Sequence, residues 1–351
     1  MRLSERLNAD SERKYRVRCF AMALTLQLIL HWARWLALEG IGRISFFQRD
    51  ASYLHFYEPI HGVAKIILTL LVYLIPLKFY LKLTATKPSE ILRPRGNAGI
   101  YRIERGGRLQ KTLFFVFASA ITIVVANFAG AITDEICYHL GVQYPAPSVM
   151  PLLSSLFLTF ISSVILAPIV EETLFRGVAV NALAPYGMGW TVLLSGLFFA
   201  LMHHSFYSLL YAFCAGCCIA FFAYVSNSLW VAVGLHFVNN LLTFAVAAVR
   251  GAIDPSAGER LGSIFMMIAA PVAIVGAVYF AVIKVWRRDV DIADVSDIAD
   301  GGGEGKEPVG SMGDGGGTYG DPIGSKAGTE SDTPVCAELV FYAVFALFSC
   351  L

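Results

Sequence analysis

The run SSLFLTFISSVILAPIVEETLFRGVAVNAL, residues 154–183, decides the fold class of this chain. It is apolar and long enough to cross a lipid bilayer, which takes about 20 such residues in a helix. Near its centre, however, stand two adjacent glutamates, Glu171 and Glu172, and an arginine, Arg176. Because an ionised side chain in hydrocarbon is costly, groups of this kind mark either a paired cluster or a functional site.

The composition of the whole chain is that of a membrane protein. The 351 residues are 56% hydrophobic and 15% charged, with a mean hydropathy of +0.63, whereas soluble proteins carry roughly 25% charged residues. The sequence therefore predicts an all-α, polytopic membrane bundle of about eight transmembrane helices. The expected spans are 19–38, 62–82, 112–133, 154–183, 188–207, 208–225, 228–249 and 261–285.

The charges outside the spans predict the orientation. The first 18 residues carry six Lys or Arg, the loop 83–111 is basic, and the last span ends in KVWRR, whereas the segment 134–148 has acidic residues and no Lys or Arg. Under the positive-inside rule the N-terminus, the basic loop and the residues after 284 are cytoplasmic, and eight spans satisfy all three. No small-residue cleavage site follows the basic start, so we expect the first helix to remain uncleaved.

The last part of the chain has a different composition. Residues 289–335 hold eleven Asp or Glu, two Lys and a glycine-rich core, which is typical of a disordered acidic tail. A short apolar end, CAELVFYAVFALFSCL, follows, and the sequence indicates no function for it. The expected organisation is a basic cytoplasmic N-terminus 1–18, N-terminal transmembrane helices 19–149, a polar-site transmembrane core 150–250, a last transmembrane helix 251–288 and the tail 289–351.

The charged residues of the core are few. Between 136 and 253 they are Glu171, Glu172, Arg176 and Arg250, and Arg250 lies at a span end, where it is explained as an interface anchor. Glu172 and Arg176 are four apart and can pair on one helix face. A structural salt-bridge cluster would explain that pair. It leaves Glu171, rotated by about 100°, as a surplus carboxylate and thus a candidate general base.

Later spans carry further polar pairs at spacings of four, Phe199 with His203 and His236 with Asn240. If 154–183 and 188–207 form an antiparallel hairpin, Glu171 and His203 lie roughly 22 and 26 Å from its turn. His236 and Asn240 lie on the order of 12–18 Å into their own span. We therefore expect these side chains to converge at neighbouring depths of the bilayer.

Pro168 stands just before the two glutamates. A proline inside a helix removes a backbone hydrogen bond and kinks the helix. Broken backbone at membrane depth is tolerated where it lines a protein cavity or water. The sequence therefore predicts a polar chamber beside the carboxylates.

These groups are sufficient for peptide hydrolysis without a covalent intermediate. A carboxylate and an imidazole can deprotonate water, and an imidazole and an amide can donate to the oxyanion. The core has no Asp and no H-E-x-x-H, and Ser195 has no nucleophile-elbow pattern around it. Cys214, Cys217 and Cys218 are interpreted as small packing residues.

A zinc site of Glu and His ligands stays open as a second mechanism. A non-enzymatic immunity or scaffold protein and a proton-coupled transporter stay open as other classes.

The order E-E-x-x-x-R, F-x-x-x-H, H-x-x-x-N resembles the type II CAAX prenyl protease family, also called the CPBP or Abi family of intramembrane proteases. The resemblance covers about 150–250 and implies a catalytic core there. Eukaryotic members of the family remove the three terminal residues of prenylated C-a-a-X proteins. Many prokaryotic relatives have unknown substrates, some are linked to bacteriocin immunity, and they are often labelled metalloproteases.

The resemblance also implies roles for individual residues. Glu171 and His203 would activate the water, His236 and Asn240 would form the oxyanion hole, and Glu172, Arg176 and Phe199 would support the site. It implies a peptide or protein substrate, lipidated or not, in contact with membrane lipid. No cofactor is required and no nucleic acid is bound in this reading. The expected location is a prokaryotic plasma membrane, with the N-terminus cytoplasmic.

Overall fold

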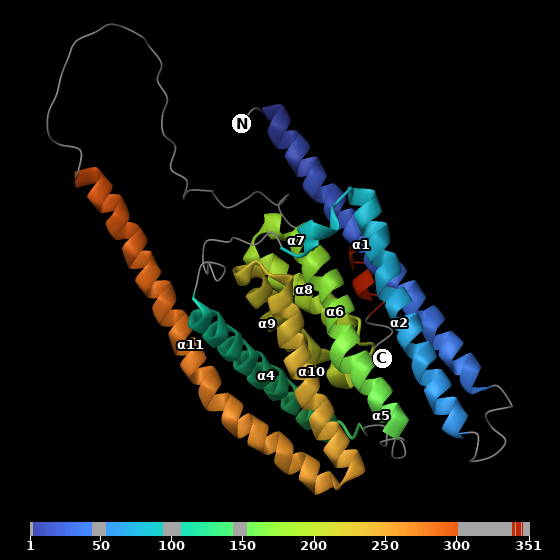
Figure 1. Ribbon diagram of the computed structural model, residues 1–351. Helices are drawn as coiled ribbons and strands as arrows, with labels where there is room; N and C mark the ends of the chain where they lie inside the picture. The colour runs from blue at the N-terminus through green and yellow to red at the C-terminus, as the bar shows by residue number, and fades with distance from the viewer. Residues whose placement is uncertain are drawn as a thin grey trace, which may run out of the picture. The chain divides into compact units, whose positions relative to one another are not determined.

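A computed structural model describes most of the chain, and every element in the described part is helical (Figure 1). The all-α membrane fold is thereby confirmed. Seven of the described helices are long and apolar enough to cross a membrane. The chain divides into two compact units, residues 1–276 with 334–351 and residues 277–333, and the site described below lies in the first. The described residues are 3–43, 54–93, 107–142, 153–300, 339–340, 342–344 and 346.

The N-terminal half contributes three long helices. Helix α1 (Leu3–Gly42) packs along α2 (Leu54–Thr84), and the pair is seen side by side in Figure 1. A short helix, α3 (Pro88–Ile91), follows, and α4 (Arg108–His139) packs against α9 of the core. These helices cover the spans expected from the apolar runs, although each extends beyond the predicted bounds.

The helix that carries the two glutamates is broken, as Pro168 predicts, but by a change of helix type. It runs as α5 (Leu153–Thr159), a π-helical segment η4 (Phe160–Leu166), α6 (Ala167–Glu172), a second π-helical segment η5 (Thr173–Val178) and α7 (Ala179–Leu183). π-Helical turns inside α-helices are rare and frequently mark functional sites. They re-aim the side chains around the glutamates without ending the helix.

Helix α8 is shorter than the span expected at 188–207. It runs from Met188 to Leu201, 14 residues, and is therefore not among the seven long helices. The chain turns at His203 and His204, and His204 adopts a left-handed backbone conformation, with φ of 47°. A residue with this backbone conformation cannot continue a right-handed helix, so a new helix, α9, begins at Phe206.

Helices α9 (Phe206–Ser226) and α10 (Leu229–Ala252) complete the core. Gly196 of α8 and Gly216 of α9 lie where the two backbones approach closely, and a Cβ on Gly196 would be 2.9 Å from the backbone nitrogen of Cys217. Cys214, Cys217 and Cys218 are free thiols on α9. Their interpretation as small packing residues agrees with this close approach.

The C-terminal part differs from the expectation at two points. Helix α11 (Pro255–Asp300) continues past the expected start of the tail at 289, and the remainder of the predicted tail up to residue 338 lies outside the described residues. The apolar end does pack on the core. Leu339, Tyr342 and Ala346 are buried, and the Tyr342 ring meets Phe198 edge-on at 5.6 Å.

Candidate functional site

Glu172 and Arg176 form the buried ion pair that their spacing predicts. Arg176 Nη1 donates to Glu172 Oε1 at 3.0 Å, and neither side chain is exposed. Arg176 also donates from Nη2 to the carbonyl oxygen of Gly216 at 2.8 Å, and its guanidinium lies 4.4 Å from the centre of the Phe199 ring. This arginine therefore ties the broken helix to both α8 and α9.

His236 of α10 is held between the two glutamates. Its Nδ1 lies 2.7 Å from Glu172 Oε1, and its Nε2 lies 4.0 Å from Glu171 Oε2. Because an ionised carboxylate can only accept, Nδ1 must carry the hydrogen of the shorter contact. Glu172 thus fixes the ring so that Nε2 faces Glu171.

Glu171 is the less constrained of the two carboxylates. Among the described residues its one hydrogen-bond partner is the Tyr73 hydroxyl at 3.3 Å, which also lies 2.6 Å from Met202 Sδ, and 13% of the Glu171 side chain is exposed. Tyr73 belongs to α2, and no motif in the sequence marks it. The contact joins residues 98 positions apart, so spacing along the chain carries no signal for it.

Phe199 brings the remaining histidine to the cluster. Its ring centre lies 4.9 Å from that of His203 and 5.5 Å from that of His236. His203 Nδ1 donates to the Phe199 carbonyl oxygen at 2.9 Å, which leaves Nε2 as the acceptor of a neutral ring. Within the described residues no hydrogen bond joins His203 to Glu171, and the His203 side chain is exposed in the turn after α8.

Asn240 contacts the site at the π-helical segment η4, where the regular α-helical hydrogen bonding is interrupted. Its Nδ2 donates to the carbonyl oxygen of Ser163 at 2.8 Å. In the π-helical segment the Ala167 N–H bonds the carbonyl of Ser162, five residues earlier, so the matching donor for Ser163 would be residue 168. That residue is proline and has no N–H. Asn240 satisfies the carbonyl that Pro168 leaves without a donor, and one amide N–H remains for another acceptor.

The structure thus assembles most of the predicted site. A chain of contacts links Glu171, His236, Glu172, Arg176 and Phe199, while His203 contacts Phe199 and Asn240 contacts Ser163. Sequence reasoning missed Tyr73, and also Gly216, whose carbonyl receives Arg176. Together these residues place Glu171, a carboxylate with few hydrogen-bond partners, 4.0 Å from the imidazole of His236.

A zinc site was the alternative mechanism, and the donor set decides whether the residues fit it. In the part of the chain that the structure describes, no three His, Cys, Asp or Glu side chains are grouped so that they could hold a metal ion. Glu172 is already engaged by Arg176 and His236. The arrangement does not fit a zinc ligand set, and no step of the mechanism below passes through one.

The fold and this cluster define a multi-pass integral membrane protein with a buried Glu–Arg–His site in its core. Residues 153–242 match the family described as Type II CAAX prenyl endopeptidase Rce1-like. This match confirms the resemblance carried by the motifs, and the family is one of membrane endopeptidases. No curated protein and no solved structure gives a significant match to the chain. All seven predicted site residues lie within 153–242, whereas Tyr73 lies outside it.

Proposed function

We propose that the protein is an intramembrane endopeptidase that hydrolyses a peptide bond with a water molecule activated by Glu171 and His203. The observation that carries the proposal is the different environment of two adjacent carboxylates. Among the described residues, Glu172 is held by Arg176 at 3.0 Å and by His236 at 2.7 Å, whereas Glu171 accepts a single hydrogen bond, at 3.3 Å from Tyr73. Glu171 can therefore accept a proton from water.

In the proposed reaction Glu171 removes a proton from the water, and the resulting hydroxide oxygen bonds to the carbonyl carbon of the peptide. The carbonyl oxygen carries the negative charge of the tetrahedral intermediate. When the carbon–nitrogen bond breaks, the proton held by Glu171 passes to the leaving nitrogen. One water is consumed, and the products are a carboxyl end and an amine.

The other groups orient the water and stabilise the charge. His203 Nε2 can accept a hydrogen from the water, since Nδ1 donates to Phe199. The second N–H of Asn240 can donate to the oxyanion, and His236 can do so when both of its nitrogens carry hydrogen. Glu172 and Arg176 hold His236, and Phe199 packs on both imidazoles. The reaction needs no cofactor.

The proposed substrate is a peptide or protein, lipidated or not, that reaches the site from the membrane or the cytoplasmic side. The resemblance and the family match support this class, and the basic segments 1–18 and 83–111 support a cytoplasmic N-terminus. The proposed host is a prokaryotic plasma membrane. Nucleic acid has no place in the reaction.

The test is cleavage of a peptide library by the purified protein in liposomes, followed by mass spectrometry. Because a positioned general base contributes about 10²–10⁴ to the rate, Glu171→Gln should lower kcat by at least about a hundredfold. His203→Ala should also lower it. Glu135→Gln and His139→Ala change an exposed pair on α4, 2.9 Å apart, and should leave cleavage unchanged.

Full cleavage by Glu171→Gln or His203→Ala would show that the mechanism is wrong. Uptake of a solute that is lost in Glu171→Gln, with no shortened peptide, would identify a transporter instead. A biological effect that survives both Glu171→Gln and His236→Ala would identify a scaffold or immunity protein.

A further inference from the structure

One side of α2 carries polar residues through the apolar part of the helix. His61, Lys65, Thr69 and Tyr73 follow one another at intervals of four residues, so each lies on the same side of the helix as the next. Ile67, on another side, is 52% exposed, as expected of a side chain that faces lipid. Because lipid cannot satisfy polar groups, the polar side of α2 faces protein or water.

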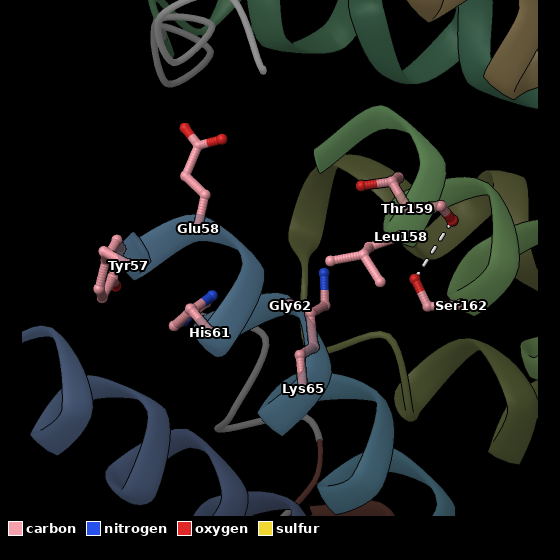
Figure 2. A pocket seen from close by; sticks show the side chains of 8 residues that line it. All are labelled: Tyr57, Glu58, His61, Gly62, Lys65, Leu158, Thr159 and Ser162. Atoms are coloured by element: carbon pink, nitrogen blue, oxygen red, sulfur yellow. Dashed lines mark hydrogen bonds between the residues drawn. The ribbon is translucent and has the colours of Figure 1, made fainter. Parts of the chain in front are cut away.

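A cavity lies at the start of this polar side. It has a volume of about 160 Å³ and lies between the first turns of α2 and the start of the broken helix, whereas one water molecule needs roughly 15 Å³. In Figure 2 the Lys65 ammonium is directed toward Leu158 across the cavity. The polar lining consists of Tyr57, Glu58, His61, Lys65, Thr159 and Ser162. The cavity is therefore large enough and polar enough to hold water.

Arg34 of α1 connects this cavity with the proposed catalytic site. It lies close enough to Lys65 and to Tyr73 to interact with both electrostatically, and its Nη1 donates to Thr69 Oγ1 at 3.0 Å. Thr69 and Tyr73 are one turn apart, about 6 Å along the axis, and the Tyr73 hydroxyl donates to Glu171 at 3.3 Å. Polar groups thus continue from the cavity to the carboxylate, with a polar residue at each turn of α2.

Several polar atoms along this path are buried and lack a hydrogen-bond partner among the described residues. They are Glu58 Oε2 at the cavity, Arg34 Nε beside Thr69, and both ring nitrogens of His204. The His204 ring lies against that of His31, with centres 3.9 Å apart, and His31 Nδ1 accepts from Arg34 Nη2 at 3.1 Å. Buried polar groups almost always have a hydrogen-bond partner, and ordered water satisfies those that the protein does not.

We infer that water reaches Glu171 along this polar path, from the side of the membrane on which α2 begins. The inference rests on the proposed function only for the use of this water, one molecule of which is consumed in each cleavage. The proposed orientation, with a cytoplasmic N-terminus, puts the start of α2 on the opposite side of the membrane, because α1 crosses once before it. Water and a peptide from the cytoplasmic side would then approach the site from opposite sides, and neither would have to pass the other.

The test is X-ray radiolysis of the wild-type protein in sealed liposomes, followed by mass spectrometry. Ionising X-rays convert bound water into hydroxyl radicals, which oxidise the side chains beside it. His31, His204 and Tyr73 should be oxidised, although the Tyr73 side chain is buried, with 5% exposed. Phe198 is equally buried, with 2% exposed, but packs on the Tyr342 ring, and should not be oxidised.

Blocking the cavity tests the direction of entry. In a cysteine-free background, a charged and impermeant thiol reagent should modify Ser162→Cys in the cavity from the same side as Gly141→Cys. Gly141 follows α4, which crosses back after α2, so it lies on the side on which α2 begins. Modification of Ser162→Cys should lower the oxidation of His31 and Tyr73, whereas modification of Gly141→Cys should not.

A variant within the path tests its middle. Thr69→Val keeps the shape of the side chain but removes the hydroxyl that binds Arg34. It should lower the oxidation of Tyr73, and it should lower kcat about twofold to tenfold, as the loss of one hydrogen bond does, with KM unchanged. Thr69→Ser restores the hydroxyl and should restore both. Thr112→Val changes an exposed threonine of α4 and should change neither.

An absence of oxidation at His31, His204 and Tyr73 would overturn the inference, because these groups would then form a dry cluster. So would oxidation that persists after Ser162→Cys has been modified, since the water would then come from the other side, or oxidation of Tyr73 that is unchanged in Thr69→Val. None of these measurements of oxidation needs a cleaved peptide. A protein that shows the expected oxidation but cleaves nothing would overturn the proposed function alone, and cleavage without the oxidation would overturn the water path alone.

Discussion

Arg176 shows how one residue can hold several helices together at membrane depth. Its guanidinium bonds Glu172 in its own helix, accepts the Phe199 ring of α8 against its face, and donates to Gly216 of α9. A planar guanidinium suits this combination, because it can stack on an aromatic face and donate in its plane at the same time. The spacing of Glu172 and Arg176 predicts the first contact only.

Replacing Arg176 should therefore be costly for stability. Arg176→Gln leaves Glu172 buried without its cation, and breaking a buried pair in this way costs about 3–5 kcal/mol. Thermal unfolding in detergent should show a markedly lower Tm. The matched control is Arg250→Gln, which removes an exposed arginine 3.6 Å from Glu259 and should cost at most about 1 kcal/mol. Equal shifts for the two variants would contradict the structural role.

At the same scale, Glu171 and Asn240 show where prediction from residues ends. The sequence identifies Glu171 as a surplus carboxylate, but its hydrogen-bond partner Tyr73 comes from α2, 98 positions away. Asn240 is predicted as an oxyanion donor, and its observed contact is the Ser163 carbonyl. That contact depends on the π-helical register before Pro168, which no pattern in the sequence indicates.

Helices α8 and α9 show how small residues set the distance between elements. Gly196 and Gly216 lie opposite each other, and a Cβ on Gly216 would be 3.1 Å from the Cα of Gly196. Close approach of this kind is a common basis of helix packing in membranes, where the hydrophobic effect does not drive association. It brings the Gly216 carbonyl within reach of Arg176.

A methyl group at Gly196 should disturb this packing. The added Cβ would lie 2.5 Å from Cys217 Sγ and 2.9 Å from the Cys217 nitrogen, and backbone cannot move aside as a flexible side chain can. Gly196→Ala should lower the free energy of unfolding by about 1–3 kcal/mol, as overpacking does. Gly189→Ala, on the same helix with nothing within 4 Å, should be neutral or slightly stabilising. A neutral Gly196→Ala would refute the close contact.

The broken helix is an element whose disruption, but not its form, follows from sequence. A proline inside a long apolar run predicts a kink. The structure instead has π-helical segments on both sides of α6, Phe160–Leu166 and Thr173–Val178. Both segments pack against α10, and η5 also packs against α2; contacts of this kind with distant helices cannot be read from local propensity.

For the whole molecule, the lengths of the helices bear on how many times the chain crosses the membrane. Eight spans were expected, and seven of the described helices reach a membrane-spanning length, while α8 has 14 residues. Under the positive-inside rule the charge pattern predicts that the basic end of the last span, 284–288, is cytoplasmic. An even number of crossings, with α8 as a short one, meets that requirement.

Cysteine labelling in intact cells tests this arrangement. In a cysteine-free background, an impermeant maleimide should label Gly141→Cys and Ser256→Cys from outside. Ser89→Cys, beside the basic loop 83–111, should react only after permeabilisation. Labelling of Ser89→Cys but not Gly141→Cys in intact cells would reverse the orientation. If Ser256→Cys alone fails to react from outside, α8 does not cross and the number of spans is odd.

The sequence by itself determined the class of protein, because the length of an apolar run and the position of Lys and Arg depend only on the cost of placing each group in lipid. It also determined the buried Glu172–Arg176 pair, since helix geometry relates residues four apart. Only the tertiary structure decided that Tyr73 supports Glu171, that Arg34 meets Thr69, that α8 ends at Leu201 and that the apolar C-terminal end packs on Phe198. These features depend on contacts between segments that are distant in the sequence, and such contacts produce no periodic pattern of residues along the chain.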